Sequence, residues 1–495
     1  MAAAPPPPPP PAGAPGDQPL ADPTGYSGAA GASLPAGVVE AAALTHHQIT
    51  LGGSPLAYTA TAGHLVARDP VSQQAEASFF YVAYTADGAD PATRPVTFFY
   101  NGGPGSASVW LHLGSFGPKR LVTGNPATNA PTPFPLVDNA ETLLDTSDLV
   151  FVDAIGTGYS QAIAPNTNQS FWGVDADAAA FRDFVVRYLA ANGRGASPKF
   201  LFGESYGTTR SAVLAHLLET AGVSLHGVVL QSSVLNYNSN CGVVRRATIA
   251  CSGHLPSYGA IGSYYALLTP PQSDLPAFMT QMRGVTATTY DPAVGIWIAT
   301  RALPAAGVLA QLAADTGVPV SRWQSTFNLD PTTFQTTLVP NVLIGRYDAR
   351  VSAPAGSALA SEGDPSSTAI AGQFRGRMAE HLRDTLRYAN ASSYVTSSGA
   401  INSWNFRHDG ADLPDTVPDL AAALTQNPRL KVLSLAGYHD IATPFHQTER
   451  DLARLPDTGQ LTQRNYPGGH MTYLDDGSRA AQKADLRAFY REALR

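Results

Sequence analysis

The sequence predicts an α/β protein built on an open, mostly parallel central sheet flanked by helices. Short, almost wholly apolar runs are typical of strands that are buried on both faces of a parallel sheet. Such runs begin at Val96, Leu149, Phe200, Gly227 and Leu430. Helical segments lie between several of these runs, and this alternation favours the α/β class.

Three earlier segments predict an antiparallel edge to this sheet. Residues 48–51, 56–62 and 77–84 are rich in β-branched and aromatic side chains, and Gly-Gly and Asp-Gly turns punctuate them. Two helices are predicted between the later strands. Residues 175–191 place apolar side chains on one face and stop at Asn-Gly, and residues 208–221 stop at a glycine.

The chain is predicted to divide into four parts. Residues 1–40 are rich in Pro, Ala and Gly and are expected to form a disordered arm. Residues 41–231 form the first part of the core. The alternation of strands and helices then stops, and prolines interrupt a series of helical segments and loops. This pattern predicts a largely helical cap insertion over residues 232–390. Residues 391–495 complete the core.

The composition excludes nucleic acid as the main partner. The 495 residues carry a net charge of −7, only 14% are charged, and Lys and Arg form no basic cluster. No apolar run reaches the roughly 18 residues of a membrane span, so we expect none. Oligomeric state leaves no signal in the sequence.

The expected location is outside the cytoplasm, either secreted or periplasmic. Cys241 and Cys251 could form a small-loop disulfide typical of an oxidising compartment, although two free thiols are the alternative. No Lys or Arg precedes Arg68, so an exported protein would have lost its signal before this sequence begins. Neither cysteine has neighbours at metal-ligand spacing, and we expect no metal or cofactor.

The sharpest motif is a Gly-x-Ser-x-Gly turn centred on Ser205. It follows an apolar strand directly and precedes a helix directly. Glycines flank a nucleophile in such an elbow because the strand-to-helix turn is tight, and the serine hydroxyl then stands exposed above the sheet. Ser205 is therefore the predicted nucleophile.

A base and an acid are expected downstream of this serine. His470 lies in a Gly-Gly-His loop near the end of the chain, and Asp440 lies in the loop after the last apolar run. Asp440 would orient His470, which takes the Ser205 proton and later returns it to the leaving group. His439 is the rival base, but a residue adjacent to the acid is a poor partner for it.

A glycine-rich turn after the Val96 strand provides the second motif, Asn101-Gly102-Gly103-Pro104-Gly105-Ser106. A phosphate loop is disfavoured, because no Gly-Lys-Ser/Thr follows and proline removes one backbone donor. The N–H groups of Gly103 and Tyr206 are instead predicted to form an oxyanion hole.

Together these motifs resemble the serine carboxypeptidase family of the α/β-hydrolase fold, in a bacterial type. A third motif, Phe-Val-Asp-Ala-Ile-Gly-Thr-Gly-Tyr-Ser from Phe151, adds to the resemblance, and the matches run in order from about Pro95 to Tyr473. The resemblance implies that Asn101, Gly102 and Glu204 hold the C-terminal carboxylate of a peptide. A carboxyl group kept protonated can donate a hydrogen bond to that carboxylate.

Two positions depart from the family pattern. Ser106 stands where the family commonly has cysteine. Ser115 stands where the family usually has a second glutamate, which shares a proton with the glutamate beside the nucleophile. A hydroxyl cannot raise the pKa of Glu204 by like-charge repulsion, so we expect a weaker preference for acidic pH than is usual in the family.

The sequence therefore predicts a serine-type carboxypeptidase whose substrates are peptides with a free C-terminus. An esterase or acyltransferase of the same fold is the first alternative, because the same three residues serve any acyl transfer. A binding protein on an inactive hydrolase scaffold is the second alternative, although no damaged catalytic position is visible.

Overall fold

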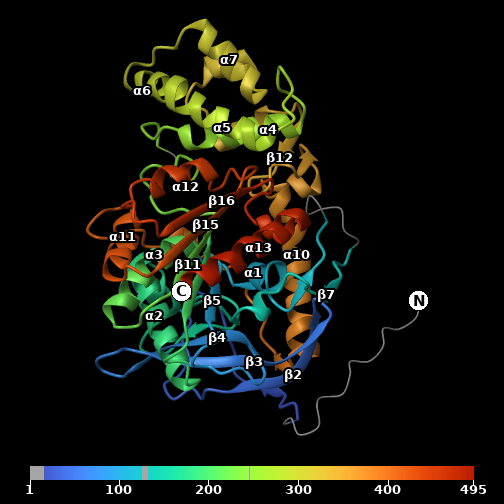
Figure 1. The fold of residues 1–495 in the computed structure, drawn as a ribbon, viewed down its shortest axis with the longest axis vertical. Helices are drawn as coiled ribbons and strands as arrows, with labels where there is room; N and C mark the ends of the chain where they lie inside the picture. Colours follow the sequence, from blue (N-terminus) through green and yellow to red (C-terminus); the bar gives the residue numbers. More distant parts are fainter. Residues whose placement is uncertain (1–15, 125–131, 245) are drawn as a thin grey trace, which may run out of the picture.

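The computed structural model describes residues 16–124, 132–244 and 246–495 (Figure 1). A ten-stranded sheet runs through the centre of this part of the chain. Its strands are β2 (Ala42–Leu51), β3 (Ser54–Arg68), β4 (Ala75–Ala86), β5 (Val96–Tyr100), β8 (Asp148–Val152), β9 (Gln161–Ala162), β10 (Lys199–Glu204), β11 (Gly227–Gln231), β15 (Lys431–Gly437) and β16 (Leu461–Tyr466).

The strand order is β16-β15-β11-β10-β5-β8-β4-β3-β2, with β9 beside β4. Strands from β16 to β8 pair in parallel, and those from β8 to β2 pair antiparallel. Every residue of β5, β8, β10 and β11 is buried, as the apolar runs predicted. The antiparallel edge also lies where the early segments predicted it.

Helices cover both faces of the sheet, because successive side chains of a strand point to opposite faces. Phe98 and Tyr100 pack in one apolar cluster with α2 (Val174–Ala191), α3 (Tyr206–Thr220) and α11 (Val417–Gln426). Phe99 lies in another cluster with α1 (Val109–Gly114), α10 (Pro365–Glu380) and α13 (Asp476–Ala493). No helix among the described residues is both long enough and apolar enough to cross a membrane.

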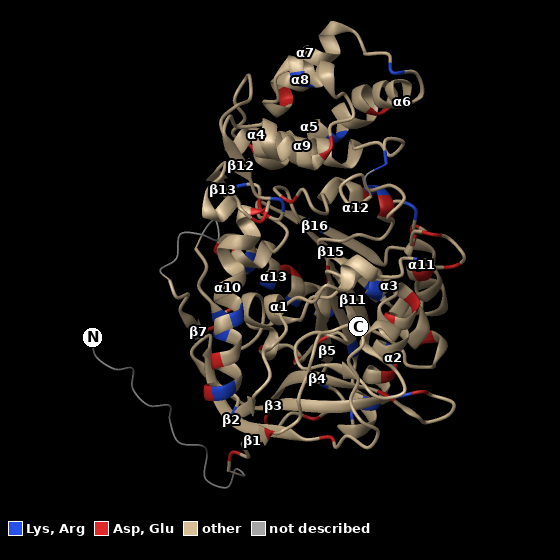
Figure 2. Ribbon diagram, turned by 180° about the vertical axis from the view of Figure 1, so that it is seen from behind, with Lys and Arg blue, Asp and Glu red and all other residues tan. Residues whose placement is uncertain are grey.

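A helical layer lies at one end of the molecule (Figure 1). Its helices are α4 (Leu255–Tyr264), α5 (Leu275–Val285), α6 (Asp291–Thr300), α7 (Ala306–Thr316), α8 (Val320–Ser325) and α9 (Pro331–Thr337). They share an apolar core around Trp323, and this core extends to Tyr438 and Ile441 after β15 and to Phe445 of α12 (Phe445–Leu452). The layer therefore packs directly on the loop that carries Asp440. Most of its ribbon carries no charged residue (Figure 2).

The C-terminal part of the predicted cap packs on the sheet rather than in the helical layer. Ile370, Phe374 and Met378 of α10 are spaced one helical turn apart and are buried in the cluster that contains α1. The ring centroids of Phe374 and Trp110 lie 5.0 Å apart. The sequence prediction missed this because the pattern of a helix does not show which neighbouring element the helix will pack on.

Two short antiparallel ribbons lie outside the central sheet. One pairs β12 (Val342–Ile344) with β13 (Ser352–Pro354), and the other, after α1, pairs β6 (Lys119–Leu121) with β7 (Leu136–Asp138).

The predicted disordered arm is wrong for residues 16–40, while residues 1–15 lie outside the described part. β1 (Leu20–Asp22) pairs in parallel with β14 (Tyr388–Asn390). The Asp22 carboxylate accepts hydrogen bonds from the hydroxyls of Tyr26 and Tyr388, over 2.8 and 2.7 Å. Leu34 is buried in a small apolar cluster. These contacts fix the segment on the core, although it is rich in Pro, Ala and Gly.

Candidate active site

Ser205 occupies a strained turn between β10 and α3. Its φ and ψ are 58° and −127°, a region that serine rarely adopts. A Cβ atom on Gly203 would lie 2.3 Å from the Gly207 carbonyl oxygen, and one on Gly207 would lie 2.9 Å from the Tyr100 carbonyl oxygen. Both flanking positions therefore require glycine. Ser205 is partly exposed, whereas the residues on both sides of it are buried.

The Asp440 and His470 side chains form a buried pair above the sheet. Asp440 lies in the loop after β15 and His470 in the loop after β16, and Oδ2 of the acid is 2.7 Å from Nδ1 of the ring. Asp440 also accepts hydrogen bonds from the Ala442 and Thr443 N–H groups, over 2.7 and 3.0 Å. These bonds satisfy the carboxylate and fix its orientation.

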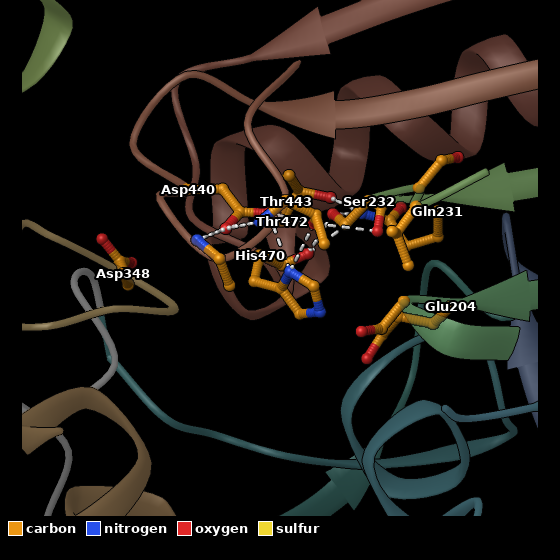
Figure 3. A network of polar contacts seen from close by, with 12 residues as sticks. Glu204, Gln231, Ser232, Asp348, Asp440, Thr443, His470 and Thr472 are labelled. Atoms are coloured by element: carbon orange, nitrogen blue, oxygen red, sulfur yellow. Dashed lines mark hydrogen bonds and ion pairs between the residues drawn. The ribbon is translucent and has the colours of Figure 1, made fainter. Parts of the chain in front are cut away.

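The environment of His470 favours protonation of its ring. Burial opposes the charged form, but the charge and hydrogen bond of Asp440 and the charge of Glu204 outweigh it, so the pKa of His470 lies above its ordinary value. Figure 3 shows the ring between these two carboxyl groups. An imidazolium stabilised in this way suits a base that must hold a proton during catalysis.

One residue missed in the sequence links the nucleophile turn to the histidine loop. The Gln231 carbonyl oxygen accepts the Ser205 N–H over 3.0 Å, and Gln231 Nε2 donates to the His470 carbonyl oxygen over 3.1 Å. Ser232 Oγ donates to the same carbonyl over 2.6 Å (Figure 3). The Tyr347 carbonyl accepts the His470 N–H over 2.6 Å. No motif marks these residues, because every one of these contacts involves at least one backbone atom, which all residue types share.

The Ser205 hydroxyl and His470 Nε2 make no hydrogen bond to any described residue. The structure thus brings Asp440 and His470 into direct contact, and it connects Ser205 to the His470 loop through Gln231. Hydrogen bonds between a nucleophile and its base are often long in free enzymes and tighten when substrate binds. The rival His439 packs its ring on Tyr264, 5.8 Å between ring centroids, and burial lowers its pKa to about 4.

The glycine-rich turn packs against the nucleophile turn. A Cβ atom on Gly102 would lie 2.4 Å from the Tyr206 nitrogen, so only glycine fits there. Gly103 has a φ of 104°, which glycine adopts without strain. The N–H groups of Gly103 and Tyr206 donate to no other described group. Each of the two touching turns therefore has one backbone donor without a partner among the described residues.

Asn101 and Glu204 form a buried polar pair next to these donors. Asn101 Nδ2 donates to Glu204 Oε1 over 2.8 Å, while Asn101 Oδ1 accepts the Leu111 N–H over 3.0 Å. Burial raises the pKa of Glu204 to about 7. Against burial, the charge of His470 and the neighbouring Tyr473 hydroxyl favour the ionised form and lower the pKa of this carboxyl group.

Ser115 contributes nothing to this carboxyl group. Ser115 directly follows α1, and its Oγ donates to the Leu111 carbonyl oxygen of that helix over 2.6 Å. The sequence argument considered only like-charge repulsion as a cause of a raised pKa at Glu204, whereas burial also raises this pKa.

Cys241 and Cys251, away from these residues in the sequence, are joined in a disulfide, with 5.3 Å between their Cα atoms.

The sequence is similar to those of serine carboxypeptidases. Residues 53–243 match the family model described as serine carboxypeptidase. The resemblance to serine carboxypeptidases is thereby confirmed. Serine carboxypeptidase-like 33 of Arabidopsis thaliana is 28% identical over 155 residues, and the match spans 30% of this chain and 30% of that protein.

The fold is that of the α/β-hydrolases, as predicted. The structure of Kex1, a prohormone-processing carboxypeptidase from Saccharomyces cerevisiae, is similar with a TM-score of 0.53 at 13% identity. The similarity covers 87% of this chain and 91% of that chain. It therefore extends beyond the segment that the family model matches, residues 53–243.

Proposed function

We propose that this chain is a serine carboxypeptidase that releases C-terminal residues from peptides. The single observation that carries the proposal is the pairing of Asn101 with Glu204 directly beside Ser205. An esterase needs the nucleophile, base and oxyanion donors alone. This site has in addition the buried carboxyl group of Glu204, whose pKa is about 7. When protonated, this group can donate a hydrogen bond to a substrate carboxylate.

In the proposed mechanism, the substrate C-terminal carboxylate accepts hydrogen bonds from Asn101, the Gly102 N–H and protonated Glu204. Ser205 Oγ attacks the last peptide carbonyl while His470 takes its proton, and the C–O bond forms. The oxyanion is stabilised by two backbone N–H groups, from Gly103 and Tyr206. This arrangement requires no metal or cofactor.

Breakdown of the tetrahedral intermediate breaks the C–N bond. His470 gives its proton to the leaving amine, which departs as the free C-terminal amino acid. Water then attacks the acyl-enzyme with His470 as base, and Ser205 regains its proton when the shortened peptide leaves. Asp440 holds the ring in place by its hydrogen bond to Nδ1 and stabilises the imidazolium.

We also propose that the helical layer bounds the peptide-binding side of the site and that the protein works in an oxidising compartment. The layer packs on the Asp440 loop, which supports the first point. The disulfide between Cys241 and Cys251 supports the second, because such bonds persist in secreted or periplasmic proteins.

The test combines active-site labelling with product analysis. A fluorophosphonate probe should label the protein at Ser205, and Ser205→Ala should remove the label. Mass spectra of a peptide mixture should show loss of single residues from C-termini in the native protein only. Internal cleavage, or hydrolysis of esters without release of amino acids, would contradict the proposal.

A further inference from the structure

Arg210 of α3 is fully buried beneath the candidate site, which makes it an unusual place for a permanent charge. Its Nε donates to Asp177 Oδ2 over 2.7 Å and its Nη2 to Asp177 Oδ1 over 3.1 Å. Such a two-point ion pair satisfies the carboxylate and offsets the cost of burying both charges. It leaves one arm of the guanidinium for another partner.

That partner is the backbone of the glycine-rich turn. Arg210 Nη1 donates to the Asn101 carbonyl oxygen over 2.9 Å. Aromatic rings enclose the guanidinium, whose carbon lies 4.2 Å from the ring centroid of Phe181 and 5.4 Å from that of Tyr206. The ion pair and the rings fix the plane of the guanidinium, and the guanidinium in turn fixes the direction of the Asn101 carbonyl.

The Asn101 carbonyl belongs to the same planar peptide unit as the Gly102 N–H. In a trans peptide the two groups point in opposite directions, so fixing one fixes the other. The Gly102 N–H donates to no described residue. A charged donor on the carbonyl also polarises the peptide unit, which makes its N–H a stronger donor.

We propose that Arg210 is the positioning residue that aims the Gly102 N–H at the C-terminal carboxylate of the substrate. It acts through the Asn101–Gly102 peptide and touches no substrate itself. This inference rests on the proposed carboxypeptidase function. Because Asp177 balances its charge, Arg210 acts on the direction and polarity of one donor rather than on the net charge of the site.

Arg194 supplies a matched control within the same sheet. It is also buried, pairs with Asp148, and donates from Nη2 to the Arg94 carbonyl oxygen over 2.9 Å. This contact lies just before the start of β5, whereas Arg210 contacts the residue just after its end. Both arginines join a carboxylate to a backbone carbonyl, but only Arg210 does so next to Ser205.

The experiment compares two peptides that differ only in a free or an amidated C-terminus. The native protein, Arg210→Lys, the double variant Asp177→Asn/Arg210→Met and Arg194→Met are assayed for kcat and KM. Replacing both members of a buried ion pair often preserves folding, so the double variant guards against a misfolded single variant. Thermal unfolding verifies that each protein is folded.

We expect the preference for the free acid to fall about tenfold in both Arg210 variants, through a higher KM for the free acid and little change in kcat. Arg194→Met should keep the native preference. A folded double variant with native preference would overturn the inference, as would an equal loss of preference in Arg194→Met. If the native protein itself shows no preference, the proposed carboxylate site fails first, and the inference fails with it.

Discussion

Asn101 Nδ2 donates a hydrogen bond to Glu204 Oε1 over 2.8 Å, and this bond joins the glycine-rich turn to the nucleophile turn. Both side chains are buried. The bond holds the carboxyl group in a place where desolvation, rather than a second acid, controls its protonation. The chemistry of the site should therefore depend on pH through Glu204.

Binding of free-acid substrates should weaken above neutral pH. Burial raises the pKa of Glu204 to about 7, so the carboxyl is protonated and able to donate below that pH, and ionised and repulsive above it. KM for a free-acid peptide should rise about tenfold per pH unit above pH 7, while KM for the amidated peptide stays level. Glu204→Gln should remove the rise. A profile of kcat/KM that peaks sharply near pH 4–5 would contradict this account.

Removing the Tyr473 hydroxyl should move that pH transition upward. After the charge of His470, the interaction with the Tyr473 hydroxyl is the next largest effect that opposes burial and lowers the pKa of Glu204. Tyr473→Phe should therefore raise the midpoint of the KM transition. Tyr490→Phe is the matched control, because its buried hydroxyl bonds to Thr97, near the other end of β5, over 2.6 Å. An unchanged midpoint in Tyr473→Phe would show that this hydroxyl does not act on Glu204.

Adding one methyl group at Gly102 should abolish most activity. The new Cβ atom would lie 2.4 Å from the Tyr206 nitrogen and 2.7 Å from the Glu204 carbonyl oxygen, so the turn must shift away from Ser205. Displacements of about 1 Å in an active site cost on the order of 100-fold in rate, and kcat/KM of Gly102→Ala should fall by at least that factor.

Gly295 offers the corresponding control in α6. A Cβ atom there meets nothing within 4 Å, so Gly295→Ala should keep full activity and raise the free energy of unfolding by about 0.5–1 kcal/mol. Native activity in Gly102→Ala would show that the close contact between the two turns is dispensable.

His408 should make stability depend on pH at alkaline values. Its Nε2 lies 2.9 Å from Asp419 Oδ2 and its Nδ1 lies 2.6 Å from Asp175 Oδ1. The hydrogen bond with Asp419 is the main cause that raises the pKa of His408 to about 9, against partial burial. A raised pKa stabilises the folded state fully below pH 6.5, and this stabilisation is lost as pH rises through 9. His408→Gln should therefore lower the urea midpoint at pH 6 and not at pH 10. Equal losses at both pH values would refute a charge effect.

The sequence was sufficient to predict eight of the ten strands of the central sheet, all except β9 and β16, and to nominate candidate catalytic residues, because both depend on local patterns. Apolar runs mark β5 and β10 wherever the sheet lies, and the glycines around Ser205 follow from the local strain of the turn. Long-range packing left no such pattern. The pairing of β1 with β14 and the packing of α10 on α1 depend on partners hundreds of residues away in the sequence.

The polar support of the site was also beyond the sequence. No motif marks Arg210 or Tyr473, and only the fold shows that Arg210 contacts Asn101 and that Tyr473 interacts with Glu204. The pKa of Glu204 shows the same limit. The sequence argument counted neighbouring charges, whereas the depth of burial, which only the fold reveals, decides the shift.

The ratio of kcat/KM for a free-acid peptide to that for its C-terminal amide, measured at pH 6, tests the central claim most directly. The account predicts that the native protein prefers the free acid by at least about tenfold and that Ser205→Ala turns over neither peptide. Equal rates on both peptides, with activity still dependent on Ser205, would contradict the carboxypeptidase account and leave only a general acyl hydrolase.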